Sequence, residues 1–317
     1  MTSAILPEHI RAAAERIRPI AHRTPVLTSR SFDGEASIRA FLKCENFQRG
    51  GAFKIRGASN FLFSLAPEQL RRGVVAYSSG NHAQAVAIAA RATGASATLV
   101  MPADAPRSKM EATRAQGATI VTYDRHRESR EEIGSRIAAE TGATLVPPFD
   151  HPWIIAGQGT TALELLEDAP ELDALITPVG GGGLLSGSAI AAKSVRPAIR
   201  IFGAEPERAN DTWQSLSAGR RVEIPTPDTI ADGLRATRPG EITFPILQRH
   251  VEEILLVSED EIKATVRFLL SRLKILVEPS GAVAAAAVLY RKLPSNIESV
   301  GIILSGGNVD FETLQAL

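Results

Sequence analysis

The sequence predicts an α/β protein with two lobes, each built around a parallel sheet. Short apolar runs alternate with alanine-rich helical stretches along most of the 317 residues, and this alternation is typical of parallel α/β architecture. A hydrophobic content of 44% is enough to bury a full core. Because three strand-and-helix units follow one another between residues 72 and 145, we predict a small domain of residues 72–145 inserted in a large domain of residues 1–71 and 146–317.

Short apolar runs that end at glycine, proline or a small polar residue are predicted to be strands. They are residues 73–78, 97–101, 119–123, 174–179, 199–204 and 300–304. The predicted helices are residues 7–18, 84–92, 109–116, 129–141, 159–167, 184–194, 259–273 and 282–291. The segment 220–241 is rich in proline, glycine and threonine, and it is predicted to be a long loop on the large domain.

The charge balance argues against nucleic acid as a partner. Lys plus Arg and Asp plus Glu are both 35, so the net charge is zero, whereas a phosphate backbone demands a basic excess. A small molecule remains open as the ligand. A near-neutral surface also tolerates self-association, and we expect a homodimer.

The single cysteine, Cys44, excludes an intramolecular disulfide and favours a cytoplasmic protein. The first residues show no basic start followed by an apolar core, so we expect no secretory signal. No run approaches the ~18 apolar residues that a membrane span needs, so we expect no membrane partner.

Lys54 is the most informative residue of the chain. It follows the bend Gly50-Gly51-Ala52 and the ring of Phe53, and the residues after it could open a helix. For a lysine taken alone, an ordinary solvated side chain is the better interpretation. Two further segments favour a chemical role.

The first of these segments is a run of four glycines, Gly180, Gly181, Gly182 and Gly183, between a predicted strand and a predicted helix. Successive glycines let backbone N–H groups converge, and the helix start adds partial positive charge, which is typical of a phosphate site. No Gly-Lys-Ser/Thr follows, and the third glycine of a dinucleotide fingerprint would fall on Leu185 or Ser186. A single terminal phosphate is therefore favoured over a pyrophosphate, and a flexible turn is the weaker alternative.

The second segment, residues 78–82 (Ser-Ser-Gly-Asn-His), ends a predicted strand and precedes a helix. Its side-chain and backbone donors suit a carboxylate, but simple capping of the helix remains an alternative. Ser305 ends a late strand and could face the same crevice, because ligands of parallel sheets bind at the carboxyl ends of strands. A turn is the alternative there.

An amine, a small-anion cradle and a phosphate cradle are what an imine with a phosphorylated aldehyde requires. In this order the segments resemble the fold-type II pyridoxal-phosphate enzymes, above all the serine/threonine dehydratases and serine racemase. The resemblance covers about residues 20–310 and includes residues 155–160 (Ile-Ala-Gly-Gln-Gly-Thr), 229–233 (Thr-Ile-Ala-Asp-Gly) and 278–282 (Glu-Pro-Ser-Gly-Ala). It implies a tryptophan synthase β-like fold.

The resemblance also implies roles for individual residues. Lys54 would form the imine with pyridoxal phosphate, and Ser79 would be the second acid/base on the opposite face of the cofactor. The other cofactor-binding residues would be Phe53 against the ring, Asn81 at the 3-hydroxyl oxygen, Gly180 to Gly183 at the phosphate and Ser305 at the ring nitrogen. Ser78, Asn81 and His82 would bind the substrate carboxylate.

The resemblance also implies a cation site and a substrate-binding arginine, and each has a simpler structural alternative. Glu205, the carbonyl of Ala209 and Asp211 would bind Mg²⁺ or Ca²⁺, whose preferred ligands are hard oxygens; the alternative is a solvated acidic loop. Arg130 would lie near the substrate and could recognise a second carboxylate, as in 3-hydroxyaspartate, or it could belong to a solvated helix face.

The sequence therefore predicts an ammonia-lyase (dehydratase) that converts a 3-hydroxy amino acid to a 2-oxo acid and ammonia. An amino-acid racemase is the enzymatic rival, and a non-catalytic phosphometabolite-binding protein is the rival from another class. Gly50 and Trp153 depart from the residues usual in the family. Gly50 removes side-chain bulk near the site, and Trp153 could add an aromatic wall or simply belong to the core. If both line the pocket, a bulkier substrate such as 3-phenylserine becomes possible.

Overall fold

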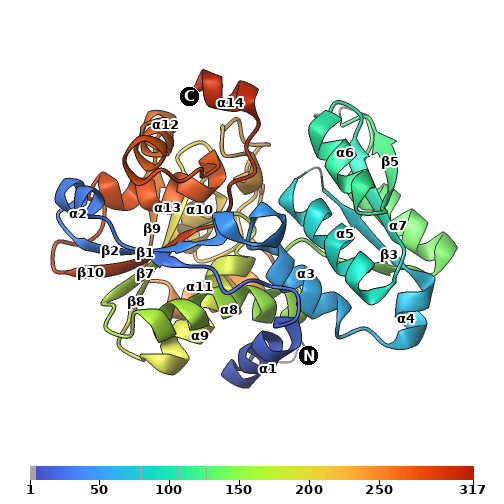
Figure 1. Ribbon diagram of the computed structural model, residues 1–317, viewed down its shortest axis with the longest axis horizontal. Coiled ribbons are helices and arrows are strands. Elements are labelled where there is room, and N and C mark those ends of the chain that lie inside the picture. The colour runs from blue at the N-terminus through green and yellow to red at the C-terminus, as the bar shows by residue number, and fades with distance from the viewer. Residues whose placement is uncertain (1–4, 79, 106, 126) are drawn as a thin grey trace.

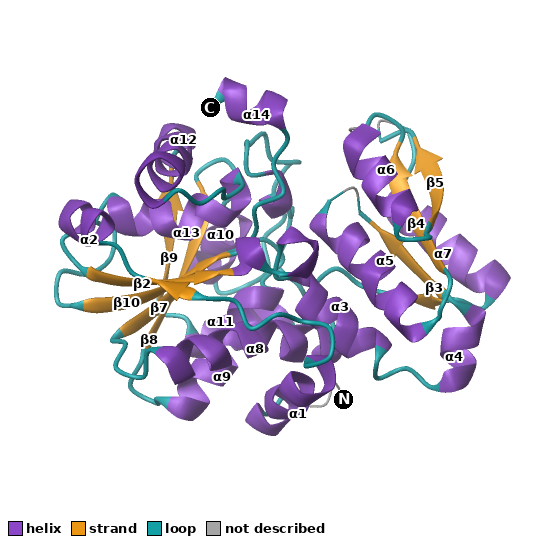
Figure 2. Ribbon diagram, viewed as in Figure 1, coloured by secondary structure: helices purple, strands orange, loops and turns teal. Residues whose placement is uncertain are grey.

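The computed structural model describes residues 5–78, 80–105, 107–125 and 127–317, and it shows two sheets side by side with helices around both (Figures 1 and 2). The larger sheet has the strand order β1-β2-β10-β7-β8-β9, and the smaller has the order β5-β4-β3-β6. The predicted fold class, an α/β protein with two parallel-sheet lobes, is confirmed. None of the described helices is long and apolar enough to cross a bilayer.

The large sheet contains β1 (Val26–Leu27), β2 (Arg39–Cys44), β7 (Ala174–Pro178), β8 (Arg200–Pro206), β9 (Glu253–Val257) and β10 (Ser299–Leu304). Every pair of neighbours is parallel except the edge pair β1 and β2, which is antiparallel. The strands β1, β2 and β9 were not predicted from the sequence.

The small sheet contains β3 (Val74–Tyr77), β4 (Ala97–Pro102), β5 (Thr119–Tyr123) and β6 (Thr144–Leu145), all parallel. The short strand β6 brings the chain back beside β3, where Val74 pairs with Thr144. The sheet lies within the predicted insertion of residues 72–145, whose bounds as a domain stay a prediction.

Helices follow most of the strands and connect the two lobes. They are α1 (Pro7–Ile17), α2 (Arg30–Ala36), α3 (Lys54–Leu62), α4 (Pro67–Arg72), α5 (Asn81–Thr93), α6 (Arg107–Ala115), α7 (Arg130–Thr141), α8 (Pro152–Asp168), α9 (Gly183–Val195), α10 (Asp211–Ala218), α11 (Thr243–His250), α12 (Glu259–Phe268), α13 (Pro279–Leu289) and α14 (Phe311–Ala316). Between α10 and α11 the only described helical element is a 3-10 turn at Asp232–Leu234, as the predicted long loop requires.

Helix α8 begins seven residues before its predicted start at residue 159, because two of its glycines serve packing and do not mark an end. A Cβ at Gly157 would lie 2.6 Å from the carbonyl oxygen of Arg56, and one at Gly159 would lie 2.6 Å from that of Gly187. The glycines thus let α8 lie directly against α3 and α9. Pro152 suits the first turn, and the His151 ring accepts from the N–H of Trp153.

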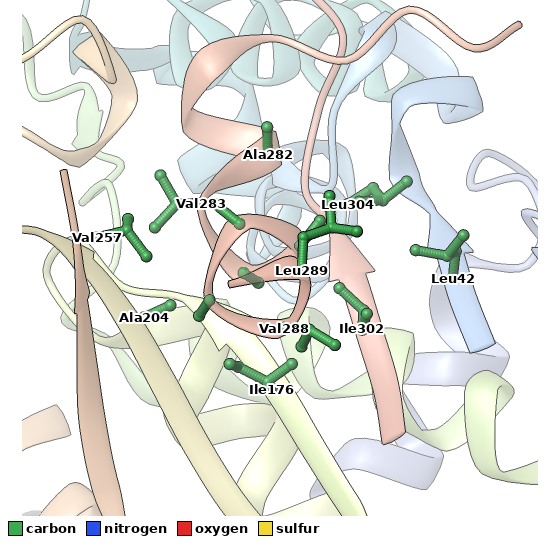
Figure 3. Close-up of a cluster of buried hydrophobic side chains, with 14 of the residues drawn as sticks. Leu42, Ile176, Ala204, Val257, Ala282, Val283, Val288, Leu289, Ile302 and Leu304 are labelled. Atoms are coloured by element: carbon green, nitrogen blue, oxygen red, sulfur yellow. The ribbon is translucent and has the colours of Figure 1, made fainter. Parts of the chain in front are cut away.

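The core of the large lobe is centred on α13, whose residues are all buried. Its side chains pack against β7, β8, β9 and β10 (Figure 3), where Val283 and Val288 lie among Ile176, Val257 and Ile302. A helix that is apolar on every side is stable only when it is enclosed. Because α13 is fixed in this way, the residues at its start have fixed positions at the carboxyl edge of the sheet.

Candidate active site

A cavity of about 220 Å³ lies between the two lobes, at the carboxyl ends of β3, β7 and β10. This is the expected ligand position in parallel α/β proteins. The predicted site residues that line it are Phe53, Lys54, Ser78, Asn81, His82, Arg130, Gly180, Gly181, Gly182, Gly183 and Ser305. Ser79 lies outside the described residues.

Lys54 is the first residue of α3, and its amine points at the segment around Pro148 that precedes α8. Its Nζ donates to the carbonyl oxygen of Pro148 at 2.8 Å, and it lies 5.2 Å from the centre of the Phe53 ring. Burial lowers the pKa of Lys54 to about 8. A larger share of the amine is therefore neutral at physiological pH than in an exposed lysine, as a nucleophile or proton acceptor requires.

The bend before Lys54 is fixed by its backbone. Gly50 and Gly51 have φ values of 73° and 72°, a left-handed conformation that favours glycine. The Phe53 N–H then donates to the Ser305 carbonyl at 3.0 Å. Lys54 and Ser305 are thereby held beside each other, although they stand near opposite ends of the chain.

A buried cluster of four charged side chains fixes the first turn of α3. The Arg56 guanidinium bonds Glu45 at 2.8 Å and Glu164 at 2.7 Å, and Lys43 bonds Glu164 at 2.7 Å. Arg56, Glu45 and Lys43 are fully buried. No local sequence pattern predicts this cluster, because its members come from β2, the segment after it, α3 and α8.

The glycine run also lines the cavity. Helix α9 begins at Gly183, and no side chain caps its first turn, so N–H groups remain for an anion and the helix dipole favours it. Gly182 has a φ of 89°, and a Cβ at Gly181 would lie 2.4 Å from the Phe149 ring. Phe149, which the sequence analysis missed, therefore packs directly on this loop.

Asn81, the first residue of α5, belongs to a hydrogen-bonded chain. Its Nδ2 donates to Oε1 of Glu278 at 2.7 Å, and its Oδ1 accepts from Nδ2 of Asn308 at 2.9 Å. Asn308 also donates to the Gly50 carbonyl at 2.6 Å. The small lobe is thus joined to the start of α13 and to the bend before Lys54. Glu278 stands in the noted segment 278–282 and Asn308 stands three residues after Ser305, but no role was assigned to either from the sequence.

His82 is buried and neutral. Its Nε2 lies 3.1 Å from the Val146 carbonyl, so this nitrogen carries the proton and donates. Burial, and then the charge of Lys54, lowers the pKa of His82 to about 3. The ring has no second N–H for a carboxylate, and a contact between His82 and the substrate carboxylate would use its backbone N–H in the first turn of α5.

Arg130 lines the cavity from the start of α7. Its guanidinium lies 5.7 Å from the centre of the Tyr77 ring, and its Nε donates to Glu131 at 2.8 Å. The sequence left open whether Arg130 lies near the substrate or on a solvated helix face. Its side chain lines the cavity and is also 48% exposed to solvent.

Gly50 and Trp153 do not line this cavity, so the condition for a wider pocket is not met. Gly50 faces a separate hollow of about 310 Å³ beside Gln84 and Ile88. Trp153 packs on Phe61 and His151, with ring centres 5.6 and 5.3 Å away. Neither is among the described residues that line the cavity, and they give no support for a substrate such as 3-phenylserine.

The carboxylates of Glu205 and Asp211 lie away from the cavity and are fully buried, so these two acids are not solvated as the alternative required. Glu205 accepts from the N–H groups of Thr212 and Trp213 at 3.1 and 2.9 Å. Neither carboxylate oxygen of Asp211 has a hydrogen-bond partner among the described residues. Burial raises the pKa of Asp211 to about 7, and burial together with Asp211 raises that of Glu205.

Two buried acids, of which Asp211 has both carboxylate oxygens without a hydrogen-bond partner among the described residues, suit a bound cation. No group of three His, Cys, Asp or Glu side chains that could hold a metal occurs in the described part of the chain. A cation at this position would need backbone oxygens, and the Ala209 carbonyl, predicted as the third ligand, belongs to a buried residue of the same segment.

Comparison with known proteins agrees with the predicted resemblance. A family model described as pyridoxal-phosphate dependent enzyme matches residues 17–306. The chain is 50% identical over 305 residues to an L-threo-3-hydroxyaspartate ammonia-lyase of Saccharomyces cerevisiae, with 96% of this chain and 94% of that protein covered. It is 46% identical over 310 residues to a serine racemase of Schizosaccharomyces pombe, with 97% and 96% covered.

Among solved structures, maize serine racemase matches with a TM-score of 0.95 and 47% identity, over 99% of this chain and 96% of that one. The serine racemase of Dictyostelium discoideum matches with a TM-score of 0.91 and 44% identity, over 97% and 99%. The family match spans most of the chain, including Lys54 and the glycine run. The chain therefore belongs to the pyridoxal-phosphate dependent enzymes of fold type II.

Proposed function

We propose that the protein is a pyridoxal-phosphate dependent ammonia-lyase that converts L-threo-3-hydroxyaspartate to a 2-oxo acid and ammonia. One observation carries the proposal: the same cavity is lined by the Lys54 amine and by the glycine run. The pKa of Lys54 is lowered, and the helix that follows the glycine run has no side-chain cap. The choice of substrate is supported by the identity of 50% to ammonia-lyases of that name from Saccharomyces cerevisiae and a Pseudomonas species.

Pyridoxal phosphate suits the residues present. The glycine run and the first turn of α9 would hold its phosphate, Phe53 would pack on the ring, and Ser305 would face the ring nitrogen. Asn81 would donate to the 3-hydroxyl oxygen with the second N–H of Nδ2, since the first is used by Glu278. When bound, the cofactor acts as an electron sink and acidifies the α-proton of the substrate.

Lys54 would hold the cofactor through its amine, and once that amine is free it would remove the α-proton at Nζ. Its lowered pKa leaves the amine free to accept a proton, and the Pro148 carbonyl orients it. The substrate α-carboxylate would lie at the start of α5, where the Ser78 hydroxyl and the backbone N–H groups of Asn81 and His82 offer donors. Loss of the β-hydroxyl would require an acid, and Lys54 or the phosphate of a bound cofactor could supply the proton.

A screen of 3-hydroxy amino acids tests the function. Purified holoenzyme is incubated with L-threo-3-hydroxyaspartate, L-serine or L-threonine, and ammonia and 2-oxo acid are measured together. Equimolar release of both products, fastest from hydroxyaspartate, is expected. No release from any of the three substrates would reject the ammonia-lyase and leave the racemase and the non-catalytic binding protein.

A racemase is the second candidate, favoured by the identity of 46% to a serine racemase. It requires a base on each face of the cofactor, and Ser79 is the proposed second base. We expect Ser79→Ala to remove racemisation and to slow elimination from one enantiomer by ~10²-fold or more, because a general acid–base group is lost. Elimination from the other enantiomer, served by Lys54, should largely remain.

Rates for both enantiomers, measured with the melting temperature, decide the role of Ser79. If Ser79 only caps α5, both rates should fall alike and stability should drop by ~1 kcal/mol. Equal losses for the two enantiomers would therefore contradict the second base.

We also propose that Glu205, Asp211 and the Ala209 carbonyl bind Mg²⁺ or Ca²⁺. Because the cation would bind the folded state alone, its removal should lower the melting temperature, with a loss of about 2.7 kcal/mol at a concentration about 100 times its Kd. We expect a chelator to lower the melting temperature of wild type and to leave that of Glu205→Ala unchanged. Exposed Glu207 offers the control, since Glu207→Ala should keep the wild-type shift; equal shifts in all three proteins would contradict the site.

Assembly and location are proposed on simpler grounds. We propose a homodimer because the net charge is zero and a near-neutral surface tolerates self-association. A cytoplasmic location is supported by a single, buried cysteine that cannot form an intramolecular disulfide.

A further inference from the structure

Arg235 lines the cavity, and the proposed reaction gives it no role. It follows the 3-10 turn Asp232–Leu234, in the loop between α10 and α11 of the large lobe. The residue is exposed, so it lies at the mouth of the cavity. Arg130 lines the same cavity from the small lobe.

The Arg235 side chain is held in place by the loop that carries it. Its Nε and Nη2 donate to the Thr229 carbonyl at 3.1 and 2.6 Å, and Thr229 is buried. The Ile230 N–H donates to Glu259 of α12 at 2.9 Å, and the Gly233 N–H donates to Ser280 of α13 at 2.9 Å. A surface arginine is usually mobile, but here the guanidinium is oriented before a ligand arrives.

The charge of Arg235 is also not neutralised. The structure records no ion pair between Arg235 and a carboxylate of the described residues, whereas Arg130 is paired with Glu131 at 2.8 Å. A guanidinium has five N–H donors, and the two bonds to Thr229 leave three for a ligand. Arg235 therefore has both the charge and the donors that recognition of a carboxylate needs.

The other charged groups around the cavity do not take this role. Burial keeps His82 neutral, and Lys54 is needed for the cofactor. Of the acids, Glu278 accepts from Asn81, and Asp232 accepts from the Ser280 hydroxyl at 3.4 Å. Arg130 and Arg235 are thus the two lasting positive charges among the described residues that line the cavity.

We infer that Arg235 recognises the second carboxylate of a dicarboxylic 3-hydroxy amino acid at the mouth of the cavity. The inference rests on the proposed function and names the residue that sets its substrate preference. Serine and threonine lack this carboxylate, so Arg235 discriminates between them and hydroxyaspartate, while the α-carboxylate binds at the start of α5.

The test compares Arg235→Gln with Arg238→Gln. Arg238 belongs to the same loop but pairs with Glu223 at 3.6 Å and does not line the cavity. For each holoenzyme, kcat/KM is measured with L-threo-3-hydroxyaspartate and with L-serine. The ratio of the two should fall at least ~10-fold in Arg235→Gln, as loss of a charge-assisted hydrogen bond implies, and should stay within ~2-fold in Arg238→Gln.

A binding measurement checks the same contact without turnover. Succinate and butyrate, which differ by one carboxylate, are compared as inhibitors. The inhibition constant of succinate should rise in Arg235→Gln, and that of butyrate should change little. Arg235→Lys should recover part of the preference, because a lysine keeps the charge without the paired N–H groups.

The measurements separate a wrong role for Arg235 from a wrong reaction for the protein. If wild type prefers hydroxyaspartate and Arg235→Gln keeps the wild-type ratio, Arg235 does not recognise the carboxylate, although the ammonia-lyase stands. Arg130→Gln is measured in the same way. If the ratio of kcat/KM for hydroxyaspartate to that for serine falls in Arg130→Gln and not in Arg235→Gln, Arg130 has the role and the inference is overturned. No ammonia release by wild type from either substrate would instead reject the proposed function.

Discussion

We expect Lys54→Ala to lower ammonia release by at least ~10³-fold, because this change removes both the covalent link to the cofactor and the base for the α-proton. The absorption band of the cofactor imine should disappear as well. Lys54 is the lysine that lines the described cavity, so no other described amine can take its place.

The matched control is Lys263→Ala, which removes a lysine of α12 that does not line the cavity. It should keep both the absorption band and the rate. Ammonia release by Lys54→Ala at the wild-type rate would contradict the assignment of the cofactor lysine.

The second large effect concerns stability. We expect Arg56→Met to lower the free energy of unfolding by about 3–5 kcal/mol, because it leaves the buried charge of Glu45 without its cationic partner and leaves Glu164 with Lys43 alone. Denaturation by urea at a fixed cofactor concentration measures this loss, since a bound cofactor stabilises the folded state.

Arg71→Met is the control, because Arg71 forms an exposed pair with Glu68 whose loss should cost less than ~1 kcal/mol. If the two variants lost the same small amount, the buried cluster would not hold α3 in place. Activity should fall with stability in Arg56→Met, since Arg56 stands two residues after Lys54 on the same helix.

Local patterns were enough to predict most of the fold. Strands such as β4 and β5 are continuous apolar runs and were placed within a residue of their observed ends. Strand β2 was missed because Lys43 breaks its apolar pattern. In the structure Lys43 is buried beside Glu164, 121 residues away in the chain, and such a long-range partner cannot be read from local spacing.

The same limit applies to the cavity. Lys54 and the glycine run were predicted to lie together because each is a short segment at a strand or helix end. Phe149 and Arg235 were missed because their positions depend on contacts with Gly181 and Thr229 that only the folded chain creates. For Trp153 the sequence left a pocket wall and a core position open, and the structure packs its ring on Phe61 and His151, outside the cavity.

The most direct test of the account is chemical trapping of the cofactor on the protein. Holoenzyme is reduced with borohydride and digested, and the peptide that carries the phosphopyridoxyl group is found by mass spectrometry. The account predicts that Lys54 carries the group and that reduction ends ammonia release from hydroxyaspartate. A label on another lysine, or an unlabelled protein that still releases ammonia, would contradict it.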